Sequence, residues 1–466
     1  MKIVVLNGSP KGKYSITLQY VTFLQKRFDQ HDIQMLNISQ QIKKIEKDEA
    51  FFNEIIRQIE CADAVIWSFG LWVLAVPAQY MRFIELISER KASNAFKDKY
   101  TAAISTSIQF YDHTAHNYIR AVCEDLDMKF IESISFYILD FMKEEKREDL
   151  LTFFENIERT VDNQLQTSRK FPRLSHNLSS YEPGEVKNKI DTDKKVLVIT
   201  DHVDQESNIA GMIQRFIRSF CQEPEVLNLN DINIKGGCIG CMTCGYDYKC
   251  HYKDGFEEFY NQQVRRADIL IFAGEMKGRY LSSTWKTFFD RAYFWNHTPS
   301  LKNKQIAYLI SGPISQNHNL SQILEGNVTA RQSANLVDII SDEPAKPELI
   351  DGCIQRLAEQ AVYYAEKDFI RPANFLSVGG HKIFRDEIFG HIRGVWQADH
   401  RHYRKNGMYD FEQKKIGMRV MNLFILTACR IPSFRKKYYA NIKKFPAQHF
   451  GKLMDKILPQ DSTVQT

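Results

Sequence analysis

The sequence KIVVLNGSPKGKYSIT, from Lys2 to Thr17, indicates the fold class of this 466-residue chain. The run KIVVL is typical of a strand that is buried on both faces. A loop of Gly, Ser and Lys follows, and then a helical pattern begins. Such a loop before a helix N-terminus favours an anion, because backbone N–H groups and the helix dipole point toward it. We therefore expect a phosphate to be held by the hydroxyls of Ser9, Ser15 and Thr17, with charge supplied by Lys11 and Lys13. A plain strand-to-helix turn with a serine cap is the alternative.

Strand and helix patterns alternate through the first 166 residues. Further aliphatic runs predict strands at Asp32–Leu36, Asp63–Trp67, Tyr100–Ser105 and Lys129–Phe136, with helices that include Glu46–Ile59 and Lys143–Gln166. This alternation predicts an α/β fold with a five-stranded parallel sheet. Ligands bind beyond the carboxyl ends of such strands. The loop after the fourth strand therefore adds three candidate residues: Ser105, Thr106 and Gln109.

The strand pattern then restarts after a polar segment. Four runs repeat the first, third, fourth and fifth strands: Lys195–Ile199, Ala267–Ile271, Gln305–Ile310 and Leu336–Ile340. This repetition indicates an internal duplication. We expect an α/β domain at 1–166, a linker at 167–193, a second α/β domain at 194–370, and a basic, mainly helical extension at 371–466.

Four of the nine cysteines lie close together in GGCIGCMTCGYDYKC, Gly236–Cys250. They are Cys238, Cys241, Cys244 and Cys250, and their spacing begins with the C-x2-C-x2-C pattern of cluster-binding runs. Thiolates so close together repel one another unless a cation or a cluster neutralises them. An iron–sulfur cluster is our main interpretation, while a structural zinc ion and free or redox-active thiols remain open. The other cysteines are isolated, as expected of reduced thiols in a cytoplasmic protein.

Charge is spread unevenly along the chain. The net charge is +5, yet residues 371–460 contain 18 Lys and Arg against 6 Asp and Glu. We expect this tail to form a helical cap on the α/β body, and a peripheral membrane or protein contact is the alternative. Its apolar run Val420–Ala428 is shorter than the ~20 residues of a membrane span. With no signal-peptide pattern and no nucleic-acid reader motif, a cytoplasmic protein that binds no nucleic acid is expected.

Together these loops resemble the flavodoxin-like NADPH-dependent FMN reductase family and its iron–sulfur flavoprotein branch. Asn7-Gly8-Ser9-Pro10, with Ser15 and Thr17, is similar to the family segment that holds the FMN phosphate. Gly70-Leu71-Trp72-Val73 resembles the loop that lines the isoalloxazine ring, with Trp in place of Tyr. In the second copy, Lys286 with Asp290-Arg291 is similar to a late family motif. The resemblance covers residues 1–165 and 194–370 and implies two tandem flavodoxin-like, doubly wound, five-stranded parallel sheets.

The resemblance also implies cofactors and their ligands. FMN contacts would come from Ser9, Lys11, Ser15, Thr17, Leu71, Trp72, Val73, Ser105, Thr106 and Gln109. A 4Fe-4S cluster would be bound by Cys238, Cys241, Cys244 and Cys250. The second copy departs from the pattern, because its first loop holds Asp201, Asp204 and Glu206 but no Lys or Arg. Our hypothesis is that copy one binds FMN and copy two carries the cluster.

The implied function is that of an oxidoreductase that passes electrons from NAD(P)H through FMN and the cluster to an unknown acceptor. No catalytic side chain is identified, since the cofactors carry the chemistry. Two alternatives remain: an electron-transfer flavoprotein without NAD(P)H activity, and a non-enzymatic scaffold or sensor stabilised by zinc. A homo-oligomer is compatible with either.

Overall fold

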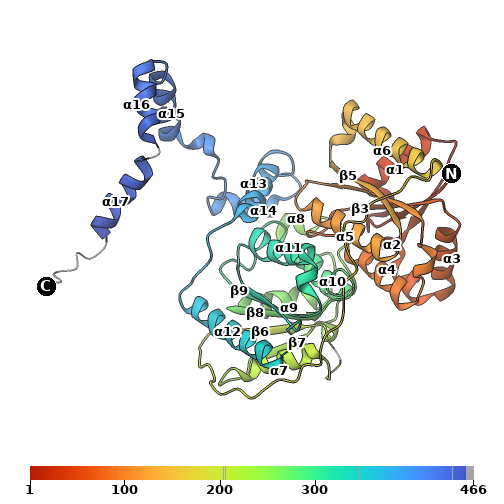
Figure 1. The fold of residues 1–466 in the computed structure, drawn as a ribbon, viewed down its shortest axis with the longest axis horizontal. Coiled ribbons are helices and arrows are strands. Elements are labelled where there is room, and N and C mark those ends of the chain that lie inside the picture. Colours follow the sequence, from red (N-terminus) through yellow and green to blue (C-terminus); the bar gives the residue numbers. More distant parts are fainter. Residues whose placement is uncertain (203, 205, 345, 443, 458–466) are drawn as a thin grey trace. The chain divides into compact units, whose positions relative to one another are not determined.

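The computed structural model describes residues 1–202, 204, 206–344, 346–442 and 444–457. Two compact units divide between Tyr403 and Arg404. The first unit holds two five-stranded sheets with helices on both faces of each (Figure 1). We call them the first lobe, β1 to α6, and the second lobe, β6 to α12.

The first lobe has the strand order β2-β1-β3-β4-β5, and every pairing in it is parallel. Its strands are β1 Lys2–Asn7, β2 Asp32–Asn37, β3 Ala64–Gly70, β4 Tyr100–Ser107 and β5 Lys129–Tyr137. Its helices are α1 Ile16–Arg27, α2 Ile38–Lys47, α3 Glu49–Glu60, α4 Ala78–Glu89, α5 Asp112–Asp125 and α6 Glu144–Asp162. This is the flavodoxin-like order, and the predicted fold class is confirmed.

The second lobe repeats the first, with the order β10-β9-β8-β6-β7 and parallel pairing throughout. Its strands are β6 Val196–Thr200, β7 Glu225–Asn228, β8 Ile269–Glu275, β9 Gln305–Ser311 and β10 Asn335–Ser341. Its helices are α7 Asn208–Arg218, α8 Cys244–Asp247, α9 Phe256–Gln262, α10 Ser283–Arg291, α11 His318–Gly326 and α12 Pro347–Glu366. The duplication inferred from the sequence is therefore a duplication of structure.

One helix prediction was wrong at its N-terminal end. The sequence suggested a single helix at Glu46–Ile59, but the chain forms α2 and then α3, with a break at Asp48. The Asp48 carboxylate accepts a hydrogen bond from Phe51 N at 3.0 Å and so caps α3. A short polar side chain that satisfies a free helical N–H favours a new helix start over continuation.

The two lobes share a hydrophobic core. Helices α1 and α6 cover the outer face of the first sheet, and α7 and α12 cover the outer face of the second. The inner faces, with α4, α5, α10 and α11, form one continuous core between the sheets. Figure 1 shows these four helices gathered between the lobes. The lobes are therefore packed on each other rather than tethered.

Reciprocal hydrogen bonds join α4 and α10. Ala78 N donates to Asp290 Oδ2 at 2.9 Å, and Ser283 Oγ donates to Glu85 Oε2 at 2.5 Å. Each helix N-terminus thus finds a carboxylate on the other helix, which suits its positive dipole end. The two lobes therefore contribute equivalent contacts to this interface, each with one helix N-terminus and one carboxylate.

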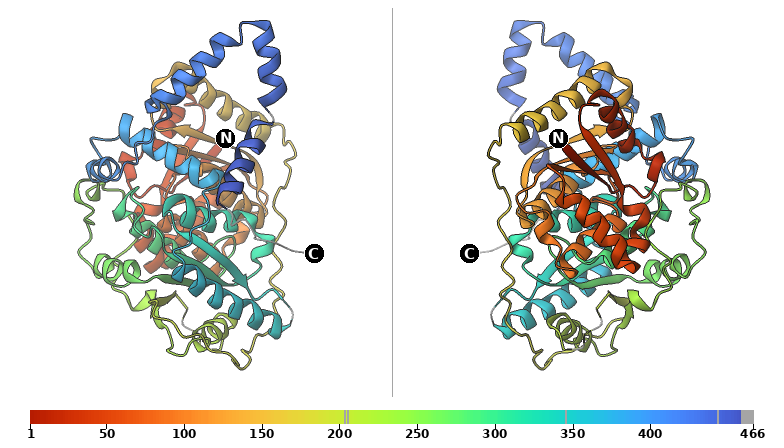
Figure 2. Two further views of the ribbon diagram at one scale, coloured as in Figure 1. Left: turned by 90° about the vertical axis from the view of Figure 1, so that its left-hand side faces the viewer. Right: turned by 90° about the vertical axis from the view of Figure 1, so that its right-hand side faces the viewer.

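The connecting segment 163–195 contains no helix or strand among these elements and runs along the outside of the lobes (Figure 2). After α12, helix α13 Phe375–Gly390 and the start of α14 Gln397–Lys405 pack on the second lobe near α8 and α11 (Figure 1). The second unit contains α15 Ile416–Ala428, α16 Pro432–Ile442 and α17 Phe445–Ile457. Among the helices that the structure describes, none is long and apolar enough to cross a bilayer.

Candidate functional site

One cavity of about 400 Å³ lies at the carboxyl ends of the first lobe's strands. Eight of the ten predicted FMN contacts line it: Ser9, Lys11, Ser15, Thr17, Leu71, Trp72, Val73 and Thr106. The second lobe lines the same cavity with all four clustered cysteines: Cys238, Cys241, Cys244 and Cys250. The two candidate sites found separately in the sequence are thus one site.

The loop between β1 and α1 and the first turn of α1 bring Ser9, Ser15 and Thr17 to the cavity. Ser15 caps α1 by accepting a hydrogen bond from Leu18 N at 3.4 Å. Thr17 Oγ1 lies 2.7 Å from Thr106 Oγ1 and donates to Phe69 O at 3.1 Å. The first-turn amides of α1 have no acceptor within the helix. The first-turn amides that Ser15 does not cap can therefore donate to an anion.

Lys11 lies between this loop and the cysteines. Burial lowers the pKa of Lys11, while Cys238 and Cys241 act in the opposite direction. Its Nζ also lies 5.6 Å from the centroid of the Trp72 ring. A half-buried cation in this position can interact with a phosphate and with thiolates at once.

The loop after β3 is strained. Val73 and Leu74 have φ angles of 37° and 63°, in a left-handed region that is unfavourable for a β-branched side chain. Two backbone hydrogen bonds between Trp72 and Ala75, at 2.8 and 3.0 Å, close the turn. From the second lobe, Lys286 Nζ donates to Trp72 O at 2.9 Å. Strain held this firmly is characteristic of functional loops.

Two predicted contacts do not line the cavity. Ser105 is fully buried, and its hydroxyl lies 2.7 Å from His116 Nε2. Gln109 is exposed at a turn where its φ angle is 59°. Their neighbours Ser107, Ile108 and Phe110 line the cavity instead.

The cysteine loop is held on both sides. Arg291 donates to both carboxylate oxygens of Asp254 at 2.8 and 2.9 Å, and to Gly236 O at 3.0 Å. From the first lobe, Gln79 Nε2 donates to Cys238 O at 3.0 Å. The motif residues Lys286, Asp290 and Arg291 therefore join the two lobes and secure this loop.

Burial and neighbouring thiols raise the pKa values of Cys238 and Cys244. Burial raises the pKa of Cys238 to about 11, although the Gly240 amide lowers it and Asp290 raises it. Burial also raises the pKa of Cys244, and Cys238, Cys241 and Cys250 raise it further. A bound cation would reverse this balance by stabilising the thiolates.

The four thiols do not converge on a point. Within the described part of the chain, no three His, Cys, Asp or Glu side chains are grouped so as to hold a single metal ion. All four thiols nevertheless line one cavity, and thiolates are ligands that iron–sulfur clusters and structural zinc share.

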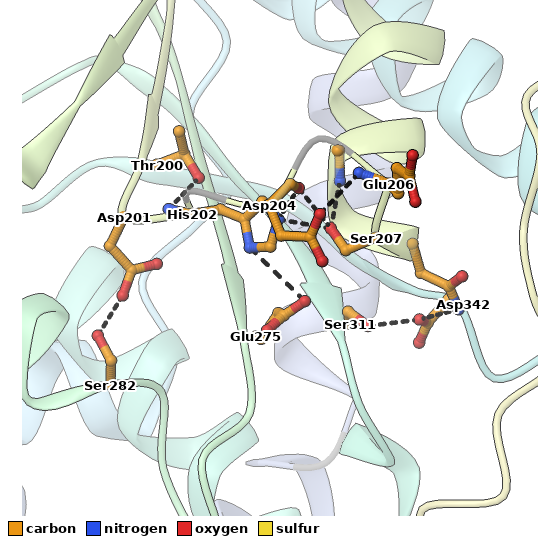
Figure 3. A network of polar contacts seen from close by, with 12 residues as sticks. Thr200, Asp201, His202, Asp204, Glu206, Ser207, Glu275, Ser282, Ser311 and Asp342 are labelled. Atoms are coloured by element: carbon orange, nitrogen blue, oxygen red, sulfur yellow. Dashed lines mark hydrogen bonds and ion pairs between the residues drawn. The ribbon is translucent and has the colours of Figure 1, made fainter.

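The corresponding loop of the second lobe is occupied by its own side chains (Figure 3). Ser282 donates to Asp201, whose pKa is raised by burial. Asp342 accepts hydrogen bonds from Ser311 Oγ at 2.6 Å and from Gly312 N at 3.0 Å. His202 lies 3.6 Å from Glu275 and 2.6 Å from Ser207. Within the loop itself, Glu206 N donates to Asp204 Oδ1 at 3.0 Å, so a backbone donor there already pairs with a carboxylate.

Sequence reasoning missed several residues of the far wall: Tyr293, His297, Arg331, Phe384 and Trp396. Two of them come from α13 and the loop after it, which have no counterpart in the repeat. No local motif marks these residues, because tertiary packing alone brings them to the cavity.

Comparison with known proteins gives one family. Residues 1–141 match the model of the family described as NADPH-dependent FMN reductase. No curated protein matches the chain.

Solved structures with similar folds cover about a third of the chain. The apo form of the NADH:FMN oxidoreductase EMOB is 14% identical, covers 36% of this chain and 91% of its own, and has a TM-score of 0.29. General stress protein 14 from Treponema denticola, in complex with FMN, is 9% identical over 35% of this chain and 99% of its own, with a TM-score of 0.26. Likenesses at this level say nothing about what the chain binds. The family match is more specific, and residues 1–141 form a domain of the NADPH-dependent FMN reductase family of oxidoreductases.

Proposed function

We propose that the chain is an NAD(P)H-dependent oxidoreductase that holds FMN in the first lobe and a 4Fe-4S cluster on the four cysteines of the second. The observation that supports this most strongly is that the loop between β1 and α1 and the four cysteines line one cavity. FMN would supply hydride chemistry, and a cluster would carry single electrons onward. Two such groups are useful to each other only when they lie close together.

The chain's own residues would position these groups. Ser9, Ser15 and Thr17, with the first amides of α1, would hold the phosphate, and Lys11 would neutralise part of its charge. Trp72 and Val73 would lie along the flavin ring. Lys11 and Arg291, which both interact electrically with the cysteines, would offset the negative charge of a thiolate-bound cluster.

The second lobe supports the division of labour between the copies. Its own phosphate-loop equivalent carries carboxylates that already accept hydrogen bonds from that loop, as Asp204 Oδ1 does from Glu206 N at 3.0 Å. A phosphate dianion there would meet Asp201, Asp204 and Glu206, which outnumber the nearby cation Lys277. We therefore place FMN in the first lobe only.

A matched pair of lysine variants tests the assignment. Lys11 lines the cavity, whereas Lys13, in the same loop, is exposed. K11M should weaken FMN binding by about tenfold or more, because a charged hydrogen bond contributes about 1.5–3 kcal/mol. K13M should bind FMN as the wild type does, as measured by quenching of FMN fluorescence. Equal FMN affinities in the two variants would show that Lys11 does not contact the FMN phosphate.

Rapid mixing with NADPH or NADH separates the candidate functions. Anaerobic bleaching of the flavin absorbance by a nicotinamide nucleotide is the expected result. A protein with bound flavin that no nicotinamide reduces would be an electron-transfer flavoprotein. A colourless protein with one zinc ion would be a scaffold or sensor.

We also propose that the segment 404–457 binds an anionic phospholipid surface. It contains thirteen Lys and Arg against three Asp and Glu. No residue of α15 is buried, and Ile416, Val420, Leu423, Phe424 and Leu426 are each more than 60% exposed. Exposed apolar side chains beside basic ones are characteristic of helices that lie in a membrane interface.

A further inference from the structure

Three side chains form a hydrogen-bonded series in the far wall of the cavity. His297 Nδ1 lies 2.7 Å from Asp399 Oδ2, and Tyr293 Oη lies 2.7 Å from His297 Nε2. Tyr293 and His297 line the cavity, while Asp399 is fully buried behind them. Tyr293 and His297 belong to the second lobe, and Asp399 comes from α14.

The hydrogen bonds fix where the protons are. An ionised carboxylate can only accept, so His297 Nδ1 carries a hydrogen. Asp399 also accepts from His297 N at 3.2 Å and from Thr298 Oγ1 at 3.0 Å. These bonds hold the imidazole in one tautomer and leave Nε2 facing Tyr293.

The series can therefore exist in two states that differ by one proton. When His297 is neutral, Nε2 accepts and the Tyr293 hydroxyl donates to it. When His297 is an imidazolium, Nε2–H donates to the tyrosine oxygen, and the tyrosine hydrogen is free to point into the cavity. Such a series can pass one proton between His297 and a molecule in the cavity.

We propose that Asp399, His297 and Tyr293 form a proton relay for the reduction of a quinone-type carbonyl acceptor, an inference that rests on the proposed function. The acceptor receives two electrons and one hydrogen as hydride from the reduced flavin. Its carbonyl oxygen takes the proton of Tyr293, and Tyr293 takes the proton of His297 Nε2. His297 ends neutral against Asp399, and water returns a proton to it after the product leaves.

The surroundings support this role. Burial raises the pKa of Tyr293, Asp399, Cys244 and Cys238 raise it further, and Arg331 acts in the opposite direction. Tyr293 thus keeps its proton until an acceptor takes it. Tyr248, whose hydroxyl lies 2.7 Å from Thr298 Oγ1, is a further titratable group near Asp399, and Arg401 acts on Tyr248 in the opposite direction to Asp399.

Apolar rings enclose the relay and suit a flat acceptor. The Phe384 ring lies 4.6 Å from the His297 ring, and the Trp396 ring lies 5.1 Å from it. Rings at this distance exclude water from the imidazole, which limits loss of the proton to solvent. They also offer a planar apolar molecule a surface to stack on.

A purely structural role would be the anchoring of α14 by Asp399. Two electron acceptors distinguish this structural role from a proton relay. Reduction of a soluble benzoquinone consumes protons, whereas ferricyanide takes up one electron and no proton. In the FMN-loaded full-length chain, Y293F and D399N should lower the ratio of quinone to ferricyanide turnover by about 100-fold, the usual scale of acid–base catalysis. H31Q is the matched control, since His31 and Glu158 form a comparable pair at 2.9 Å in the first lobe and outside the cavity lining.

A second readout needs no cofactor. The imidazole Nδ1–H of His297 should give a low-field proton resonance in wild-type protein that is absent from D399N and H297Q and kept in H31Q. An unchanged turnover ratio in Y293F that still binds FMN would overturn the relay alone, as would equal losses with both acceptors. Wild-type protein that binds no FMN would overturn the proposed function, and the relay with it.

Discussion

Replacing Gly240 with alanine tests the contact between the cysteine loop and the proposed flavin site of the first lobe. Gly240 has a φ angle of +66°, and a Cβ there would lie 2.6 Å from Lys11 Cε and 2.6 Å from Trp72 Cη2. The lysine end can move away, but the Trp72 turn is closed by backbone hydrogen bonds to Ala75. The loop must therefore shift away from the first lobe in G240A.

The expected cost has two parts. A left-handed conformation costs an alanine about 1–2 kcal/mol. Overpacking a well-packed contact costs about 1–3 kcal/mol more. Gly278 provides the control, because its φ angle is +64° and a Cβ there would meet nothing within 4 Å. G278A should therefore show the backbone cost alone.

Urea unfolding and FMN binding of the full-length chain measure the difference. G240A should lose about 1–3 kcal/mol more stability than G278A. Its FMN dissociation constant should rise about tenfold, because moving the loop disturbs both Lys11 and Trp72. Equal stability and equal FMN affinity in the two variants would refute the packing of the cysteine loop on the flavin site.

Three further predictions concern pH, the buried ion pair and the tail. Burial lowers the pKa of His116 to about 4, so between pH 6.5 and 4 the unfolded chain binds a proton that the folded chain does not. Stability should fall as pH drops through this range, and wild type should lose about 2 kcal/mol more than H116Q between pH 7 and 5 in urea titrations. K286M should lower the free energy of unfolding by about 3–5 kcal/mol, because it removes the cation that pairs with the buried Asp290 carboxylate. K304M, at the more exposed pair with Asp268, should lower it by less than about 1 kcal/mol in the same assay. In sedimentation with phosphatidylglycerol vesicles, L423E should lose binding. M142E, at a side chain 81% exposed in the first lobe, should bind as the wild type does. Equal binding of the wild type to neutral phosphatidylcholine vesicles would contradict the proposed surface.

The sequence allowed the sheets to be placed because each parallel strand is a short run of aliphatic residues buried on both faces. The repeat then revealed the second lobe. Strand ends were less predictable, since β3 continues to Gly70 and β4 to Ser107 as their backbones stay paired with neighbours. The break at Asp48 was missed because a cap depends on one local hydrogen bond.

The candidate site was predictable where the chain order dictates it. Residues after β1, β3 and β4 meet at one edge of the sheet, so most predicted contacts line the cavity. Ser105 does not, because side chains alternate along a strand, and Thr106 takes the position facing Thr17 while Ser105 faces His116.

The residues of the far cavity wall could not be predicted from the sequence. His297 and Asp399 are separated by 102 residues, and neither lies in a recognisable motif. The interface between the lobes could not be predicted either, because the hydrogen bond from Lys286 to Trp72 O depends on how the two lobes pack.

The cofactor content of anaerobically purified full-length protein tests the central claim most directly, that one cavity serves a flavin and a cysteine-bound cluster. We predict about one FMN, with about four iron and four sulfide, per chain. C244S should lose the iron while retaining FMN. Two FMN per chain, or zinc in place of iron on the cysteines, would contradict the account.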